Sequence, residues 1–175
     1  VGPGDEVIVP SNTYIATWLA VTEVGARPVP VEPHPGTWNI DPKRLGPALT
    51  AKTRAVMPVH LFGQAADLDP ILAFARKQGL KVIEDAAQAH GVRYQGRRIG
   101  CHGDAVAWSF YPSKNLGAYG DGGAVSTADA AVADKIKVLR NYGSRQRYHN
   151  EVAGKNSRLD ELQAAVLRVK LPLLD

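Results

Sequence analysis

Short apolar runs alternate along this chain with segments of helical periodicity. The runs lack the apolar–polar alternation of half-exposed strands, so each predicts a strand buried on both faces. We expect such strands at residues 7–9, 28–31, 54–59, 80–83, 105–110 and 123–126. Most are followed by a helix, expected at 13–24, 41–49, 67–79, 128–140 and 159–169. This order predicts an α/β fold, with a mostly parallel sheet covered by helices on both faces.

Turn and capping residues mark the boundaries of these elements. Asp41 and Pro42 form an N-cap followed by proline at the first helical position. Gly25 and Gly79 are placed to end the first and third helices. A small hairpin is expected at 92–99, and the polar stretch 141–156 predicts a loop.

Composition and charge exclude several classes of protein. The chain of 175 residues has 45% hydrophobic and 22% charged residues, which is typical of one soluble globular domain. Its net charge of +4 comes from scattered basic residues, which argues against a nucleic-acid binder and suits small anionic ligands. No apolar run approaches the roughly 20 residues of a membrane span. The single cysteine fits a reducing, cytoplasmic compartment.

Two neighbouring strand ends carry residues with candidate chemistry. Glu84 and Asp85 close the strand that begins at Leu80, and Lys114 follows the strand 105–110. Ligands of open parallel sheets bind beyond the carboxyl ends of the strands. Each residue has an ordinary alternative, since Asp85 could cap a following helix and Lys114 could be an exposed surface lysine. Together they are the acid and the amine that pyridoxal phosphate needs.

Other constellations are weaker. The glycines of residues 117–123 follow Lys114, whereas a P-loop places its lysine after the glycines, and no dinucleotide-binding fingerprint is present. Cys101, His102 and Asp104 match no metal motif, so no metal is expected. His60 and His90 follow strands near the presumed site and are candidates to support it from behind.

The order of several motifs resembles the DegT/DnrJ/EryC1/StrS family of sugar aminotransferases. The motifs span Pro3 to Pro10, Asn12 to Thr17, Pro58 to Gly63, Glu84 to Gly91, Ser109 to Gly117, Gly120 to Gly123, Leu139 to Gly143 and Asn156 to Ala165. The resemblance implies the large domain of a pyridoxal-phosphate-dependent enzyme of fold type I.

Within the family, the chain is most similar to enzymes that make 3-amino-3,6-dideoxyhexoses on a dTDP carrier. The segments Asn12 to Trp18 and Tyr111 to Gly117 carry this finer likeness. The chain departs from those enzymes at Ser113, where glycine is usual, and at Tyr119, where leucine is usual.

The resemblance implies a role for each of five residues. Lys114 would hold the cofactor covalently and move protons during catalysis. Asp85 would keep the pyridine nitrogen protonated, and Gln88 would contact the phenolic oxygen of the ring. Tyr14 would stack on the ring, unless it is a core aromatic residue, and Ser109 would bind the phosphate.

The resemblance also implies partners. Asn156 would reach the cofactor phosphate of a neighbouring subunit, which implies a homodimer with composite active sites. Tyr111, Tyr148 and Arg158 are candidate contacts of the sugar substrate. By family habit, L-glutamate would donate the amino group and leave as 2-oxoglutarate, and a nucleotide-linked keto-deoxysugar, dTDP-3-keto-6-deoxyhexose in the finer interpretation, would accept it.

Three alternatives stay open at this point. A 4-keto-sugar is a possible acceptor, and a regulatory, non-catalytic use of the fold is a second possibility. Relatives with histidine at the lysine position catalyse dehydration, and Lys114 argues against that.

Both ends of the chain look cut, so we expect residues 1–175 to be the central part of the cofactor-binding large domain. The smaller C-terminal domain would lie beyond Asp175, and the fragment alone would be inactive.

Overall fold

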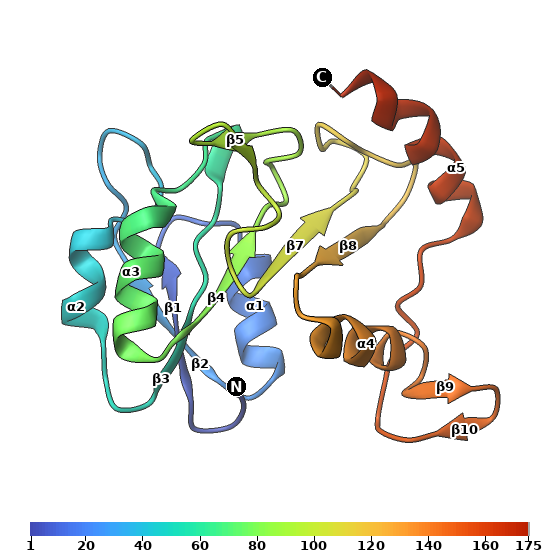
Figure 1. The fold of residues 1–175 in the computed structure, drawn as a ribbon, viewed down its shortest axis with the longest axis horizontal. Helices are drawn as coiled ribbons and strands as arrows, with labels where there is room; N and C mark the ends of the chain where they lie inside the picture. Colours follow the sequence, from blue (N-terminus) through green and yellow to red (C-terminus); the bar gives the residue numbers. More distant parts are fainter. Residues whose placement is uncertain (175) are drawn as a thin grey trace.

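A sheet of six strands forms the centre of the molecule (Figure 1). The computed structural model describes residues 1–174. In spatial order the strands are β2 (Arg27–Val31), β1 (Glu6–Pro10), β3 (Thr53–Val56), β4 (Lys81–Asp85), β7 (Ala105–Ser109) and β8 (Gly123–Ser126). All pair in parallel except β8, which runs antiparallel to β7. The predicted mostly parallel sheet is confirmed.

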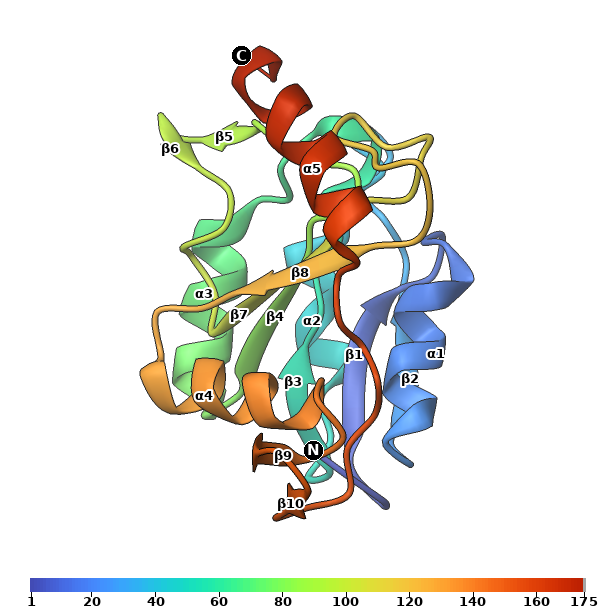
Figure 2. The same cartoon turned by 90° about the vertical axis from the view of Figure 1, so that its right-hand side faces the viewer.

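Helices cover both faces of this sheet. They are α1 (Ile15–Glu23), α2 (Leu45–Ala48), α3 (Leu68–Gln78) and α4 (Ala130–Leu139), whereas α5 (Glu161–Lys170) lies beside the loops at one edge of the sheet. Figure 2 shows α1 and α3 on opposite sides of the strands. No helix of residues 1–174 has the length and apolar character needed to cross a membrane.

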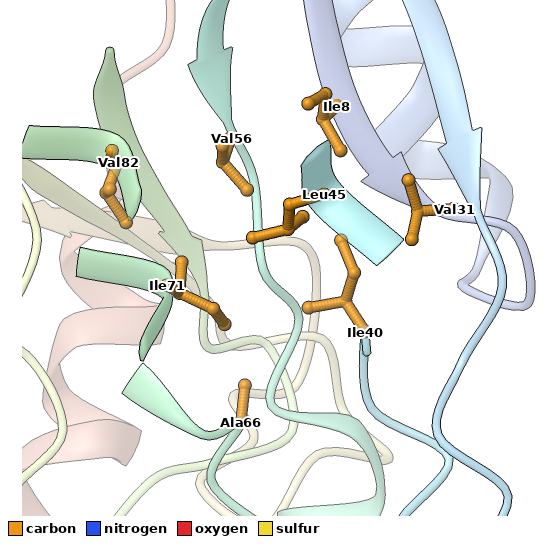
Figure 3. Packing of buried hydrophobic residues seen from close by; sticks show 9 residues of the cluster. Ile8, Val31, Ile40, Leu45, Val56, Ala66, Ile71 and Val82 are labelled. Carbon is orange, nitrogen blue, oxygen red and sulfur yellow. The ribbon is translucent and has the colours of Figure 1, made fainter. Parts of the chain in front are cut away.

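The alternation of side chains along β1 explains the two-sided core. Ile8 packs with Leu45 of α2 and Ile71 of α3 in a cluster of nine buried residues (Figure 3). Its neighbours Val7 and Val9 point to the other face and pack in a second cluster with α1. Successive residues of a strand face opposite sides, so an unbroken apolar run fits a strand that is covered twice.

Most predicted boundaries differ from the structure by one or two residues, and two elements differ more. The strand expected at 54–59 ends at Val56, because Pro58 has no N–H for the ladder. The Pro58 carbonyl still accepts the Asp85 N–H at 2.9 Å, and Val59 makes an isolated bridge to Asp85. The helix expected at 41–49 is split into a 3₁₀ turn, Pro42–Arg44, and α2.

The stretch 141–156 was predicted to be a loop, and this is wrong in part. It contains an antiparallel hairpin of β9 (Ser144–Gln146) and β10 (His149–Asn150). These strands are polar, and all their residues except Ser144 are exposed, so no apolar alternation predicts them. Arg145 links the hairpin to Asp134 of α4 at 2.6 Å. The hairpin expected at 92–99 is confirmed as β5 (Arg93–Tyr94) and β6 (Arg97–Arg98).

Candidate active site

A cavity of about 550 Å³ opens at the carboxyl edge of the sheet. The start of α1, the ends of β4 and β7, and the turn that follows β7 form its walls. This volume is in the range of small-molecule and cofactor sites. Six residues with roles expected from the sequence line it, namely Tyr14, Asp85, Gln88, Ser109, Tyr111 and Lys114.

The carboxylate of Asp85 is held at both oxygens. The Thr17 hydroxyl donates to Oδ2 at 2.8 Å, and the Ala87 N–H donates to Oδ1 at 3.1 Å. Donors on both oxygens suit an ionised, acceptor-only carboxylate. No helix follows β4 before the hairpin of β5 and β6, so the alternative that Asp85 caps a helix is wrong. The carboxylate is therefore a fixed negative group in the wall of the cavity.

Thr17 and Thr13 form a hydroxyl chain that the sequence interpretation missed. Their Oγ1 atoms lie 2.9 Å apart. Because the single hydroxyl proton of Thr17 is donated to Asp85, Thr13 must donate to Thr17. Thr17 is 2% exposed, so its hydroxyl has little access to water. The spacing of two threonines by four positions at the start of a helix was the available signal.

Replacing Thr17 by valine is expected to weaken, about 10-fold in the full-length protein, the pyridoxal phosphate binding that the sequence resemblance implies. Valine matches the shape of threonine but leaves Asp85 Oδ2 without its donor, and a hydrogen bond to a charged group contributes about 1.5–3 kcal/mol. Titration of the apoprotein by fluorescence measures the dissociation constant. Thr17→Ser keeps the hydroxyl and serves as the control. If the valine variant and the wild type bound the cofactor equally well, the hydrogen bond from Thr17 to Asp85 would make no contribution to binding.

The turn that carries Lys114 is tightly closed. The Lys114 N–H donates to the Tyr111 carbonyl at 2.9 Å. A Cβ on Gly117 would lie 2.4 Å from the Pro112 carbonyl oxygen, so only glycine fits there. Lys114 is half-buried and lines the cavity, which excludes the alternative of an ordinary exposed lysine.

The helix α5 supports this turn from behind. Lys170 donates to the Gly117 carbonyl at 2.6 Å, and Gln163 Oε1 accepts the Tyr119 N–H at 2.8 Å. Leu116 packs with Leu167 in a small apolar cluster. The ribbon confirms that α5 lies beside the loops at the upper edge of the sheet (Figure 1). The position of Lys114 thus depends on a segment about 50 residues further along the chain.

Gln88 and Tyr14 lie in positions that suit their expected roles. Gln88 Oε1 accepts the Phe62 N–H at 2.7 Å, which identifies the oxygen and leaves the amide nitrogen as the remaining donor. Tyr14 is 72% exposed at the mouth of the cavity, so the alternative of a core aromatic residue is wrong.

The start of α1 offers a site for an anion. Tyr14 is its N-cap residue and makes no side-chain capping bond. The first N–H groups of a helix lack intrahelical acceptors and bind phosphate well. The residues of this first turn line the cavity, as does Ser109, whose Oγ accepts the Tyr111 N–H at 3.3 Å. One cavity therefore offers partners for three kinds of ligand group. The start of α1 suits a negative group, Asp85 suits a protonated ring nitrogen, and Lys114 suits a carbon that reacts with amines.

A buried, hydrogen-bonded histidine–carboxylate pair lies directly behind the site. The side chains of His60 and Glu84 are both fully buried, and His60 Nε2 lies 2.9 Å from Glu84 Oε2. His60 Nδ1 accepts the Ala66 N–H at 3.0 Å, so Nε2 carries the proton and donates it to the carboxylate. Glu84 also accepts the Gly103 N–H at 2.5 Å. This network ties β4 to the loop after β3 and so supports the backbone on which Asp85 lies.

Three expected site residues do not reach this cavity in the described chain. Asn156 is exposed, and its Oδ1 accepts from Arg158 Nε at 3.1 Å. Arg158 also lies over the ring of Tyr142, at 5.6 Å from the centroid. Tyr148 is 84% exposed beside Arg147, at the turn of the β9–β10 hairpin. Their roles toward cofactor or substrate stay predictions.

Comparison with known proteins places the chain among aminotransferases. The model of the DegT/DnrJ/EryC1/StrS aminotransferase family matches residues 1–175. The chain is 59% identical, over its full length, to a dTDP-3-amino-3,4,6-trideoxy-alpha-D-glucose transaminase of Streptomyces venezuelae, of which it covers 46%. It is 61% identical to the erythromycin biosynthesis sensory transduction protein EryC1 of Saccharopolyspora erythraea, again over its full length and covering 48% of that protein. The chain spans about half the length of these relatives.

Solved structures agree in fold. The crystal structure of S. venezuelae DesV in complex with a ketimine intermediate has a TM-score of 0.97 and 60% identity, covering all of this chain and 47% of that one. The Bacillus subtilis protein NtdA, solved with bound cofactor PMP, has a TM-score of 0.93 and 36% identity, covering 99% of this chain and 40% of that one. The expected fold class is confirmed.

Proposed function

The chain belongs to the DegT/DnrJ/EryC1/StrS aminotransferase family, and from this premise we propose that it is the cofactor-binding part of a pyridoxal-phosphate-dependent sugar aminotransferase. One observation carries the proposal: Asp85 and Lys114, from different strand ends, line the same cavity. Bound pyridoxal phosphate supplies an electron sink for the carbon that gains or loses the amino group.

The residues of the cavity fit that cofactor. Asp85, held by Thr17 and Ala87, offers a carboxylate to the protonated ring nitrogen. The amide nitrogen of Gln88 can donate to the ring hydroxyl group, because its oxygen is occupied by Phe62. The open start of α1 and Ser109 suit the phosphate, and Tyr14 suits the ring face.

Lys114 performs two tasks in this proposal. Its amine would hold the cofactor covalently in the resting enzyme, with loss of water, and once freed by the substrate amine Nζ would accept and return the proton of the substrate carbon. Only a neutral amine can begin either task. The closed turn and α5 hold the lysine in the cavity wall, so little reorganisation is needed between the two half-reactions.

The proposed donor is L-glutamate, and the proposed acceptor is a nucleotide-linked keto-deoxysugar, dTDP-3-keto-6-deoxyhexose in the first instance. The name of the S. venezuelae relative supports a dTDP-linked 3-amino sugar. Tyr111 lies in the cavity wall and is the candidate substrate contact of this chain. Asn156, Tyr148 and Arg158 lie outside the cavity, which agrees with a homodimer in which they serve a neighbouring active site.

We further propose that residues 1–175 belong to the large domain of a cytoplasmic enzyme whose smaller domain completes the substrate site. The coverage of about half of each relative supports this view. Activity is therefore a property of the full-length protein.

A regulatory role is the second candidate, favoured by the name of the S. erythraea relative, a sensory transduction protein. The two candidates differ in turnover. Full-length protein loaded with pyridoxal phosphate should release 2-oxoglutarate from L-glutamate and then aminate the dTDP-linked 3-keto sugar. Folded, cofactor-loaded protein that does neither, with 3- or 4-keto sugars, would contradict the aminotransferase and leave the regulator.

A further inference from the structure

His90 and the residue after the lysine are joined by two reciprocal hydrogen bonds. His90 Nδ1 and Asn115 Oδ1 lie 2.8 Å apart, and Asn115 Nδ2 donates to the His90 carbonyl at 2.8 Å. The second bond fixes the amide orientation, because only Nδ2 can donate to a carbonyl. Asn115 Oδ1 is then the acceptor, so His90 Nδ1 carries the proton.

Asn115 and two aromatic rings surround the buried side chain of His90. It is 6% exposed, and its ring lies 5.3 Å from the ring of Trp108 and 5.7 Å from that of Phe110. Both aromatic residues belong to β7 or the residue that follows it. His90 comes five residues after Asp85 on the segment that also carries Gln88. The imidazole therefore lies where the segment after β4, the end of β7 and the lysine turn meet.

The hydrogen bond between His90 and Asn115 can hold the lysine turn in place without bringing a charged histidine close to Lys114. Burial lowers the pKa of His90 below its ordinary value, opposed by the hydrogen bond with Asn115 and reinforced by the charge of Lys114. A lowered histidine pKa means a neutral ring at pH 7, so the histidine holds the turn without adding a positive charge of its own.

We propose that His90 and Asn115 are positioning residues, a latch that sets Lys114 against Asp85 for covalent attachment of the cofactor. This inference rests on the proposed function. The backbone of Asn115 follows Lys114 directly, so a shift of the turn moves the lysine amine with it. A misplacement of about 1 Å can slow a reaction up to about 100-fold, while binding that does not involve the lysine is untouched.

The test uses full-length protein and two ligands that differ in one property. Pyridoxal 5′-phosphate can bond to Lys114, whereas pyridoxamine 5′-phosphate binds without a covalent bond to lysine. We expect Asn115→Ala and His90→Phe to slow the attachment of pyridoxal phosphate about 10-fold. The affinity for pyridoxamine phosphate should change less than about 2-fold. Borohydride trapping with peptide mapping measures attachment, and calorimetry measures affinity.

Two further variants separate positioning from general damage. Asn150→Ala removes an exposed asparagine whose Nδ2 donates to the Tyr142 carbonyl, and should leave both readouts unchanged. The double variant of His90 and Asn115 should be no slower than the worse single variant, because both break one contact. Asn115 is exposed, so Asn115→Ala carries the test if His90→Phe fails to fold.

The outcomes are distinguishable. Slow attachment with intact pyridoxamine phosphate binding supports the latch. Unchanged attachment in Asn115→Ala overturns it, and so does an equal loss of both readouts, which would indicate a structural role only. Wild-type protein that forms no adduct at Lys114 would instead refute the proposed function on which the latch depends.

Discussion

Replacing Lys114 by alanine is expected to lower kcat of the full-length enzyme about 10⁴-fold, the upper range for loss of a proton-transferring group. Among residues 1–174, Lys114 is the only lysine that lines the cavity, so no other lysine of this part of the chain can take over its role. Covalent attachment of pyridoxal phosphate should also disappear. Steady-state amino transfer and absorbance of the bound cofactor measure the two losses.

The matched control is Lys77→Ala, which removes an exposed lysine on α3. It should leave kcat and cofactor attachment unchanged. A Lys114→Ala variant that retains more than about a tenth of the wild-type kcat would contradict the role of this lysine, since loss of a general acid–base group costs at least about 100-fold.

The second large effect is expected at Asp85. Asp85→Asn should lower cofactor affinity and kcat, each about 100-fold, because a hydrogen bond to a charged partner contributes about 1.5–3 kcal/mol. The local geometry adds to this loss. The Thr17 hydroxyl and the Ala87 N–H both donate to the carboxylate, and an amide has only one oxygen to accept them.

Cofactor titration and steady-state kinetics of the full-length variant measure both losses. Glu32→Gln removes an exposed acid that follows β2, and it is the control for loss of one negative charge. If Asp85→Asn and Glu32→Gln behaved alike, the carboxylate would have no direct role toward the ring nitrogen.

The core of the fold could be predicted because its signal is local. Each inner strand is an apolar run, and Ile8 and Val9 pack on opposite faces of one sheet as the pattern requires. The hairpin of β9 and β10 escaped prediction, since its residues are polar and carry no apolar pattern, and its ion pair with α4, Arg145 with Asp134, joins positions that no local signal connects. The early end of β3 was missed although the proline that lacks an N–H for the ladder, Pro58, is visible in the sequence.

The candidate site was likewise predicted only in part. Lys114 and Asp85 stand out in the sequence because a lysine and an acid at strand ends carry recognisable chemistry. Thr17 does not, because its partner Asp85 is 68 positions away and threonine at the start of a helix is common. His90 was expected only to support the site, and its bond to Asn115 became visible once the two turns lay side by side.

The central claim is that Lys114 is the covalent anchor of pyridoxal phosphate. Borohydride reduction of the full-length protein after addition of the cofactor, followed by peptide mass mapping, tests it most directly. The account predicts a pyridoxyl group on the peptide that contains Lys114 and none in Lys114→Ala. An adduct on another lysine, or none in a folded protein, would contradict the mechanism and leave only the fold.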